Sequence, residues 1–194
     1  MVKMDVKRII VDSATIFFSK YGYYKTTMDD IAKHIHKAKG VLYYYFKSKE
    51  ELFNEVLKQE LDTVKSQLRQ IVNNDTDPIF TLKEYILTRL KLLNKSINYN
   101  ETLKADFFEE YHFVKDVRDD FDEFDRNQLT YIIEKGKNEG FIDIKNIKST
   151  VDVIMMVVNS VEIPLFQRNR YNEYENTIEE LASMIVDSLR NQRK

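Results

Sequence analysis

A run of eight residues near the amino terminus, positions 39–46, gathers side chains that suit contact with a charged polymer. Its lysine can meet a phosphate or a guanine edge, and its phenols can donate hydrogen bonds to phosphate oxygens. Its glycine admits close approach of the backbone, and its valine can contact a thymine methyl group. The side chains concerned are Lys39, Gly40, Val41, Tyr43 and Tyr44. Side chains of these types can make contacts with a nucleic-acid duplex.

The spacing of apolar residues predicts that this run is the third of three short helices. The first helix has residues at three- and four-residue steps, which place them on one face. These residues are Val6, Ile9, Ile10, Ala14, Phe17 and Tyr21. Gly22 is expected to end this helix in a left-handed conformation. Thr27 then begins the second helix, where its hydroxyl and the carboxylate of Asp30 form a capping box.

A connector of three residues, His36 to Ala38, separates the second helix from the third, and this spacing is typical of a helix-turn-helix. In the third helix, Leu42 and Phe46 lie one turn apart and are expected to pack inward. The three tyrosines at positions 43–45 have a simpler interpretation as core residues. Three consecutive aromatics cannot all point inward, so we expect Tyr43 and Tyr44 outside and leave Tyr45 open.

The charge distribution agrees with a polyanionic partner. The whole chain has a net charge of −2, from 30 basic and 32 acidic residues. Residues 1–50 contain ten basic and five acidic residues, a net of +5, so the remainder has −7. A basic amino-terminal region on an acidic body favours a polyanion as the partner, while a solvated charge bias without function is the alternative.

From Arg8 to Leu57 the chain resembles the amino-terminal domain of the TetR family of transcriptional regulators. The resemblance rests on the first helix and its glycine, on the block from Thr26 to Ala32, on the block from Lys39 to Phe46, and on a capped helix from Ser48 to Phe53. It covers about a quarter of the chain. It implies an all-α fold of about nine helices, with a helix-turn-helix DNA-binding domain at residues 1–50 and a larger domain at 51–194.

The family resemblance further implies that two amino-terminal domains bind a pseudo-palindromic operator in double-stranded DNA. The residues expected to touch DNA are Thr27, Lys37, Lys39, Gly40, Val41, Tyr43, Tyr44 and Lys49. Three residues of the turn depart from the family pattern: His36 replaces a common glycine, Lys37 a common aliphatic residue and Ala38 a common Ser or Thr cap. Histidine tolerates a left-handed backbone better than most residues, so we interpret the departures as tuning.

The rest of the chain also shows helical periodicity and no strand-like alternation. A fourth helix should begin with a second capping box, Ser48 with Glu51, and reach about Val72. Further helices are expected from Pro78, from about Asp116 to Asn138, from Thr150 to Phe166, and from Tyr174 to Arg190. The segment 150–166 is apolar nearly all round, so we expect it and the segment 174–190 to form a four-helix homodimer interface. An intrachain core is the alternative.

The family resemblance implies that the larger domain binds a small molecule, and the composition of that domain favours an apolar ligand. Aromatic and methionine side chains can line a pocket between helices. The candidates are Tyr85, Phe107, Phe108, Tyr111, His112, Phe124, Met155 and Met156. A highly charged ligand would need a basic cluster, which residues 80–166 do not obviously contain. The expected protein is therefore a cytoplasmic repressor that a mainly apolar ligand releases from DNA.

Two other classes of function remain open. Glu109 and His112 form a Glu-x-x-His pair, the spacing used in di-metal carboxylate enzymes, but such sites need a second pair and the other histidines lie near residue 35. A helical adaptor that does not bind DNA is the other alternative. The chain contains no cysteine, no P-loop and no dinucleotide fingerprint, so we expect no enzyme activity, cofactor or metal. We also expect no export signal and no apolar run of about 20 residues that could span a membrane.

Overall fold

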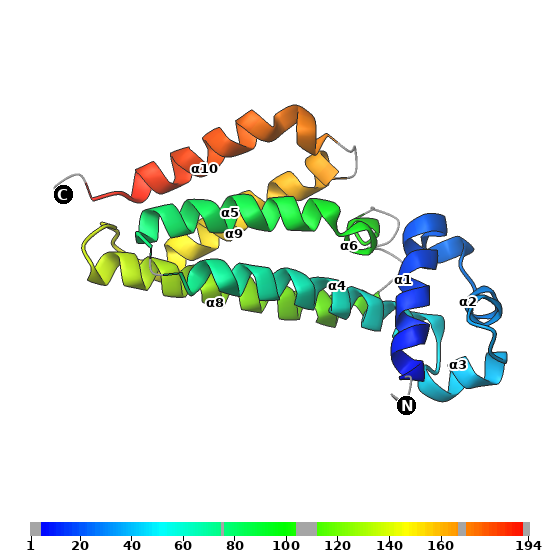
Figure 1. The fold of residues 1–194 in the computed structure, drawn as a ribbon. Coiled ribbons are helices and arrows are strands. Elements are labelled where there is room, and N and C mark those ends of the chain that lie inside the picture. Colours follow the sequence, from blue (N-terminus) through cyan, green and yellow to red (C-terminus); the bar gives the residue numbers. More distant parts are fainter. Residues whose placement is uncertain (1–4, 75, 104–111, 167–169, 192–194) are drawn as a thin grey trace. The chain divides into compact units, whose positions relative to one another are not determined.

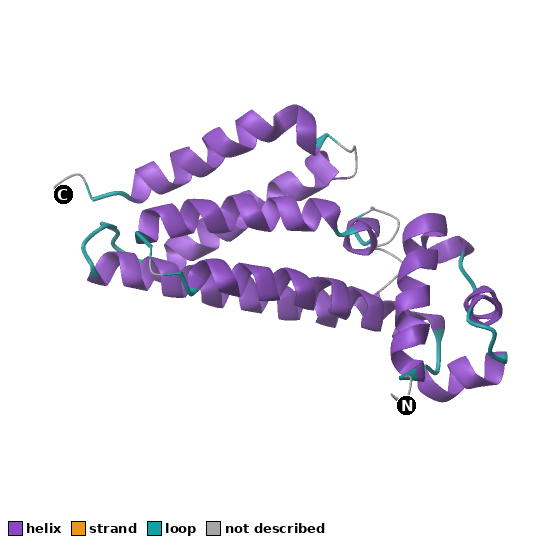
Figure 2. Cartoon of the chain, in the orientation of Figure 1, coloured by secondary structure: helices purple, strands orange, loops and turns teal. Residues whose placement is uncertain are grey.

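The structure is a computed structural model that describes residues 5–74, 76–103, 112–166 and 170–191. Within these residues the chain forms nine α-helices, two short 3₁₀ helices and no strand, which confirms the expected all-α class (Figures 1 and 2). Contacts divide the chain into two compact units. Unit 1 comprises Met1–Asp62 and Ser96–Val117, and unit 2 comprises Thr63–Lys95 and Arg118–Lys194. The predicted functional boundary at residue 50 therefore differs from the packing boundary, and it stays a prediction about DNA contact.

Unit 1 contains the three amino-terminal helices, the first half of a long fourth helix and a short sixth helix. These are α1 (Val6–Lys25), α2 (Met28–His34), α3 (Lys39–Tyr45), α4 (Lys49–Val72), α6 (Ile97–Glu101) and the 3₁₀ helix η1 (His112–Val114). The expected bounds of α3 and the carboxyl end of α4 agree with the structure. Gly22 has φ of 80°, so the left-handed break predicted there is confirmed, although a last helical turn follows it.

The predicted inner face of α1 is partly wrong. Ile10 and Ala14 are buried as expected, but the core side chain in the next turn is Phe18, and Tyr21 is exposed. The reason is an aromatic cluster that the break at Gly22 creates, because it turns Tyr23 back into the core. The centroid of the Phe18 ring lies 5.9 Å from that of Tyr23 and 5.0 Å from that of Phe53 on α4.

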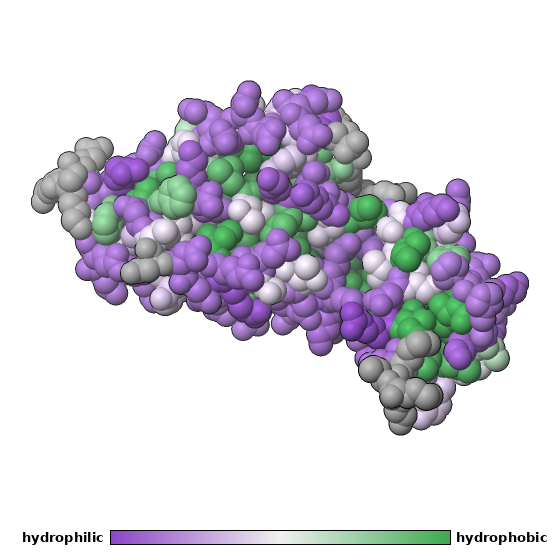
Figure 3. Space-filling view, viewed as in Figure 1, coloured by the Kyte–Doolittle hydropathy of each residue, from purple (hydrophilic) through white to green (hydrophobic). Residues whose placement is uncertain are grey.

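Unit 2 is a bundle of α5 (Pro78–Lys95), α8 (Lys115–Asn138), α9 (Ile147–Phe166) and α10 (Glu175–Leu189), with the second half of α4. The 3₁₀ helix η2 (Tyr171–Tyr174) precedes α10. On the face drawn in Figure 3, hydrophilic side chains predominate over this unit and apolar ones show between the helices. The starts of α5 and α8 agree with the sequence prediction within one residue, and α9 begins three residues earlier than predicted.

The core of unit 2 holds a buried ionic network that joins three helices. Arg89 of α5 is 1% exposed, and its Nε donates to Asp125 of α8. Its two terminal nitrogens donate to Glu162 Oε1 and Asn159 Oδ1 of α9, both at 2.8 Å. Tyr85 Oη donates to the second oxygen of Asp125 at 2.5 Å. Since buried charges are tolerated only when they are paired, this network fixes the registers of α5, α8 and α9.

The segment Ile147–Phe166 corrects the expectation that no run could span a membrane, since by length and composition alone this helix could do so. The surroundings of the helix are those of a bundle element. Its Glu162 is buried against Arg89, and its Asp152 pairs with Arg126 of α8 and with Lys148 one turn earlier. Paired charges on two faces are typical of a helix packed in protein.

Candidate nucleic-acid interface

The turn between α2 and α3 has the geometry that its sequence predicts. Thr27 Oγ1 accepts a hydrogen bond from the backbone N–H of Asp30 at 3.2 Å, and Asp30 Oδ2 accepts from the N–H of Thr27 at 3.2 Å, so the first capping box is confirmed. His36 has φ of 53°. This left-handed residue lets the N–H of Lys37 donate back to the carbonyl of Ala32 at 3.0 Å and thereby closes α2.

Helix α3 divides into a buried face and an exposed face. Leu42 and Phe46 are buried, which anchors the helix on unit 1. Tyr43 and Tyr44 are 43% and 82% exposed, as predicted, and Tyr45 is half-buried with its ring 5.1 Å from that of Tyr44. Five of the other residues expected to touch DNA are exposed or half-buried. Thr27, Lys37, Lys39 and Gly40 are exposed, and Val41 is half-buried.

The position of Gly40 is open on its outer side. A methyl group added there would meet no atom within 4 Å, apart from its own helix and chain neighbours. Its backbone is helical, so the glycine is not required for folding of α3. An exposed helical glycine costs about 1 kcal/mol relative to alanine, so the stability of α3 does not favour glycine at this position.

Lys39 stands at the start of α3 in an ion pair with α2. Its Nζ lies 3.0 Å from Asp29 Oδ1 and 5.8 Å from the centroid of the Tyr43 ring. The hydrogen bond to the Asp29 carboxylate raises the pKa of Lys39, so the ammonium stays charged. The lysine is thus held by one acidic and one aromatic neighbour, in a position exposed to solvent.

The start of α4 differs from what the sequence suggested for Lys49. Ser48 Oγ accepts a hydrogen bond from the N–H of Glu51, and Glu51 Oε2 accepts one from the N–H of Lys47. In a standard capping box the second bond would come from the N–H of Ser48 itself, one residue later. Lys49 Nζ donates to the carbonyl of Tyr23 at 3.0 Å and lies 4.2 Å from the centre of its ring. Burial lowers the pKa of Lys49. Its ammonium therefore stabilises unit 1, and only a rearrangement would bring it to a phosphate.

The predicted ligand residues do not gather into one described pocket. Phe107, Phe108 and Tyr111 lie outside the described residues, as does Glu109. Tyr85, Phe124 and Met155 are buried in unit 2, where Tyr85 belongs to the ionic network. His112 is exposed in unit 1, and Met156 is 72% exposed on α9, which argues against a place for Met156 inside a pocket of unit 2.

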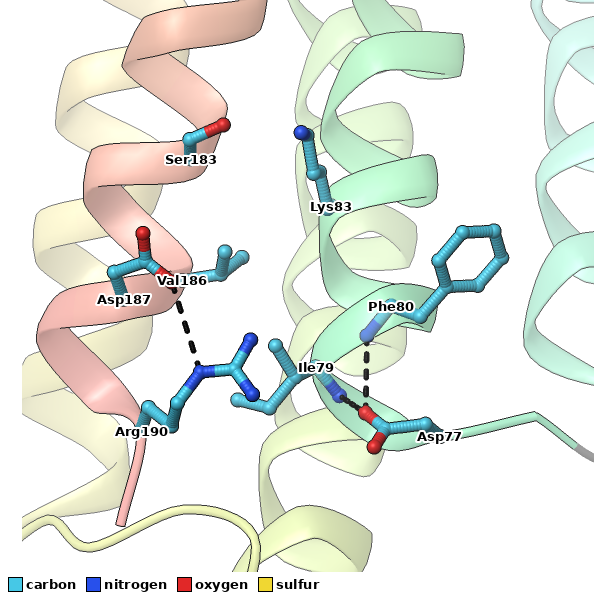
Figure 4. A pocket seen from close by; sticks show the side chains of 8 residues that line it. All are labelled: Asp77, Ile79, Phe80, Lys83, Ser183, Val186, Asp187 and Arg190. Carbon is cyan, nitrogen blue, oxygen red and sulfur yellow. Dashed lines mark hydrogen bonds and ion pairs between the residues drawn. The ribbon is translucent and has the colours of Figure 1, made fainter. Parts of the chain in front are cut away.

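Unit 2 has a surface pocket of about 370 Å³ between the start of α5 and the end of α10 (Figure 4). Two cations and two carboxylates line it, so their charges balance. Asp77 caps α5 through the N–H groups of Ile79 and Phe80, and Asp187 lies 3.6 Å from Arg190 Nε. The lining residues are Asp77, Ile79, Phe80, Lys83, Ser183, Val186, Asp187 and Arg190. None of the predicted ligand residues is among them.

A second feature of unit 2 is an apolar face on α9 and α10. The exposed residues Val153, Met156, Ser160 and Ile163 follow a three- and four-residue spacing along α9. On α10 the same spacing is followed by Leu181, which is half-buried, by Met184, which is 63% exposed, and by the exposed polar residues Thr177 and Ser188. Between the two helices lies an apolar groove of about 300 Å³, lined in part by Val153, Val157 and Ile185. Such spacing is that of helices which pack against other helices.

Metal binding has no support in the part of the chain that the structure describes. No group of three His, Asp or Glu side chains there is arranged to hold an ion. The di-metal alternative depended on Glu109, which lies outside the described residues.

A capped helix, a four-residue turn and a second helix with an exposed basic and aromatic face define a helix-turn-helix DNA-binding protein. Comparison with known proteins gives the same class. The model of the bacterial regulatory proteins of the tetR family matches residues 10–56. The uncharacterized HTH-type transcriptional regulator YhgD of Bacillus subtilis is 31% identical over 147 residues, which cover 73% of this chain and 74% of YhgD. The chain belongs to the TetR family, and it is a DNA-binding transcriptional regulator.

Solved structures share the whole fold. A TetR transcription regulator from Haloarcula marismortui is similar with a TM-score of 0.80 and 19% identity, over 96% of this chain and 99% of that one. The regulator FadR from Bacillus subtilis, solved in complex with stearoyl-CoA, is similar with a TM-score of 0.70 and 17% identity, over 93% and 95% of the two chains. At these identities the similarity establishes the fold alone.

Proposed function

We propose that this regulator is a repressor that binds a pseudo-palindromic operator through α3 and the turn before it. The exposed face of α3 carries the proposal, because buried Leu42 and Phe46 fix the helix while the basic and aromatic side chains face solvent. Lys39 and Gly40 approach the groove, and Tyr43 and Tyr44 bind phosphates. Thr27, Lys37, Val41 and Lys49 complete the contact surface, with Lys49 the least available of them.

We further propose that the regulator acts as a homodimer, in which α9 and α10 of two copies form a four-helix interface. Val153, Met156 and Ile163 on α9, with Met184 on α10, support this arrangement, because isolated apolar side chains are common on protein surfaces whereas several at helical spacing on one face are not. The groove between α9 and α10 can receive a side chain from the second copy. Replacing Met156 with Glu should yield monomers in sedimentation equilibrium. As a control, Glu123→Gln also changes the net charge by one unit, at an exposed position of α8, and should leave dimers intact.

The ligand is proposed to be small and mainly apolar. Buried Phe124 and Met155 supply apolar surface in unit 2, and the described pockets offer no basic cluster for a highly charged molecule. The FadR structure from Bacillus subtilis, of the same fold, contains stearoyl-CoA. The acyl chain of that molecule is apolar but its CoA part is highly charged, so the comparison supports only an apolar portion of the ligand. Phe107, Phe108, Tyr111 and His112 remain candidates for contact with it.

A regulator of this kind works in the cytoplasm, where the DNA is, and needs no enzyme activity. The proposed operator binding can be tested in a gel-shift assay with the DNA upstream of the protein's own gene. We expect Lys39→Ala to weaken binding by about tenfold or more, and Tyr43→Phe to weaken it less, since the phenol donates one hydrogen bond and the ring stays.

Binding by both variants that matches the wild type would remove α3 as the recognition element. An adaptor that does not bind DNA would show no affinity that falls with salt. A stoichiometric content of two metal ions in the purified protein would instead support a di-metal enzyme. Screening apolar compounds for release of the bound DNA then addresses the ligand.

A further inference from the structure

We propose that Asp29 is a specificity-determining positioning residue, which holds Lys39 ready for base contact and away from general attraction to phosphates. The inference rests on the proposed binding of DNA by α3. Asp29 lies on α2, and its Oδ1 is 3.0 Å from Lys39 Nζ. Both side chains are about half exposed, so the pair forms part of the surface that meets the duplex.

Asp29 is not needed to begin its own helix. The capping box of α2 is made by Thr27 and Asp30, whose hydrogen bonds are complete without Asp29. The carboxylate of Asp29 instead crosses the turn to α3. An acidic side chain in the first turn of a helix is favourable to a small degree, but that effect does not require an ion pair with the next helix.

A carboxylate beside the DNA-binding face has a cost, because it repels every phosphate of every duplex. The same carboxylate balances the positive charge of Lys39 and holds its ammonium group. Without it, the flexible side chain of the lysine would let the ammonium reach the nearest phosphate. The Tyr43 ring, 5.8 Å from the ammonium, restricts the lysine from a second side. Affinity for any sequence is thereby reduced, while the position of the one cation at the start of α3 is fixed. Selectivity is the difference between two affinities, and such a device increases it.

The experiment compares wild-type protein with Asp29→Asn on two duplexes. One duplex is selected by the wild type from a random-sequence library, and the other is a scrambled sequence of the same length and composition. For Asp29→Asn we expect affinity for the scrambled duplex to rise by about tenfold, with little gain on the selected one. The slope of log affinity against log salt on the scrambled duplex should steepen by about 0.9, since one more cation reaches a phosphate.

Asp12→Asn is the matched control. It removes the same charge from unit 1 and breaks an exposed pair with Arg8, 3.8 Å away on α1. We expect it to leave both the selectivity and the salt slope close to those of the wild type. If Asp12→Asn lowers selectivity as much as Asp29→Asn does, the effect is one of net charge and the proposal is overturned.

Lys39→Ala decides whether Asp29 acts through the lysine. In that background, Asp29→Asn should cause no further loss of selectivity. An equal loss with and without Lys39, or equal gains in affinity on both duplexes, would overturn the proposal. If the wild type selects no duplex and binds none in a salt-dependent manner, the proposed DNA binding itself fails, and the inference with it. Circular dichroism of each variant verifies that α2 and α3 remain folded.

Discussion

Replacing Arg89 with Met tests the ionic network of unit 2. The side chain is 1% exposed, and it forms ion pairs with Asp125 and Glu162, which are themselves buried. Methionine fills a similar volume but donates no hydrogen bond. Removing one partner from a buried ion pair costs about 3–5 kcal/mol, because the remaining charge stays desolvated. The whole protein is expected to have about 5–15 kcal/mol of stability, so this change removes a large part of it.

Urea denaturation followed by circular dichroism measures the loss. With an m-value of about 3 kcal/mol/M, the unfolding midpoint of Arg89→Met should fall by roughly 1–2 M. The matched control is Arg126→Met, since Arg126 pairs with Asp152 on the surface of the same unit. An exposed pair contributes about 0–1 kcal/mol, so the midpoint of the control should move little.

The pH dependence of the loss gives a second signature. Without the guanidinium, burial raises the pKa of the carboxyl groups in the folded variant above the values in the unfolded chain. The folded variant then binds more protons than the unfolded one, and its stability increases as the pH falls. The deficit of Arg89→Met should therefore shrink between pH 7 and pH 5. A midpoint equal to that of Arg126→Met, or a deficit that grows on acidification, would refute the reasoning.

Three further predictions follow from single positions. Gly40→Ala should preserve the fold or stabilise it by about 1 kcal/mol, yet reduce DNA affinity in a gel shift, because the methyl group occupies the space of a groove contact. Gly136→Ala should lower the unfolding midpoint, at a cost of about 1–3 kcal/mol, since the new carbon would lie 2.9 Å from Ile142 Cγ1 and 3.1 Å from Pro78 Cβ. Burial, followed by the charge and hydrogen bond of Asp125, raises the pKa of Tyr85. The free energy of unfolding of the wild type should therefore fall above about pH 10, by about 1.4 kcal/mol per pH unit. For Tyr85→Phe, the same measurement against pH should show a shallower fall.

The helix-turn-helix could be predicted almost completely because its signals are local. A cap and its partner lie three residues apart, as Thr27 and Asp30 do, and the anchoring pair of α3 is separated by one turn. A left-handed backbone at His36 needs only the preference of that residue type. Each feature is decided within a few residues, so no distant part of the chain is required to recognise it.

Partners from distant segments could not be predicted. Arg89 occupies a position on the apolar stripe of α5, four residues after Tyr85 and four before Leu93, and this placement was the available signal for a buried cation. Its partners Asp125 and Glu162 come 36 and 73 residues later. The face of α1 was misjudged for the same reason, because its aromatic neighbours come from other elements. Likewise, nothing near Lys49 in sequence indicates that its ammonium binds the carbonyl of Tyr23.

Helix α9 shows how two competing interpretations of one sequence can both apply. Its residues are apolar nearly all round, which indicates burial but does not identify what buries each side. One face, with Val151, Ile154 and Val158, is buried within unit 2, as an intrachain core requires. The opposite face leaves Val153 and Met156 exposed in a single chain. In the homodimer proposed above, a second copy would cover this face together with Leu181 and Met184 of α10.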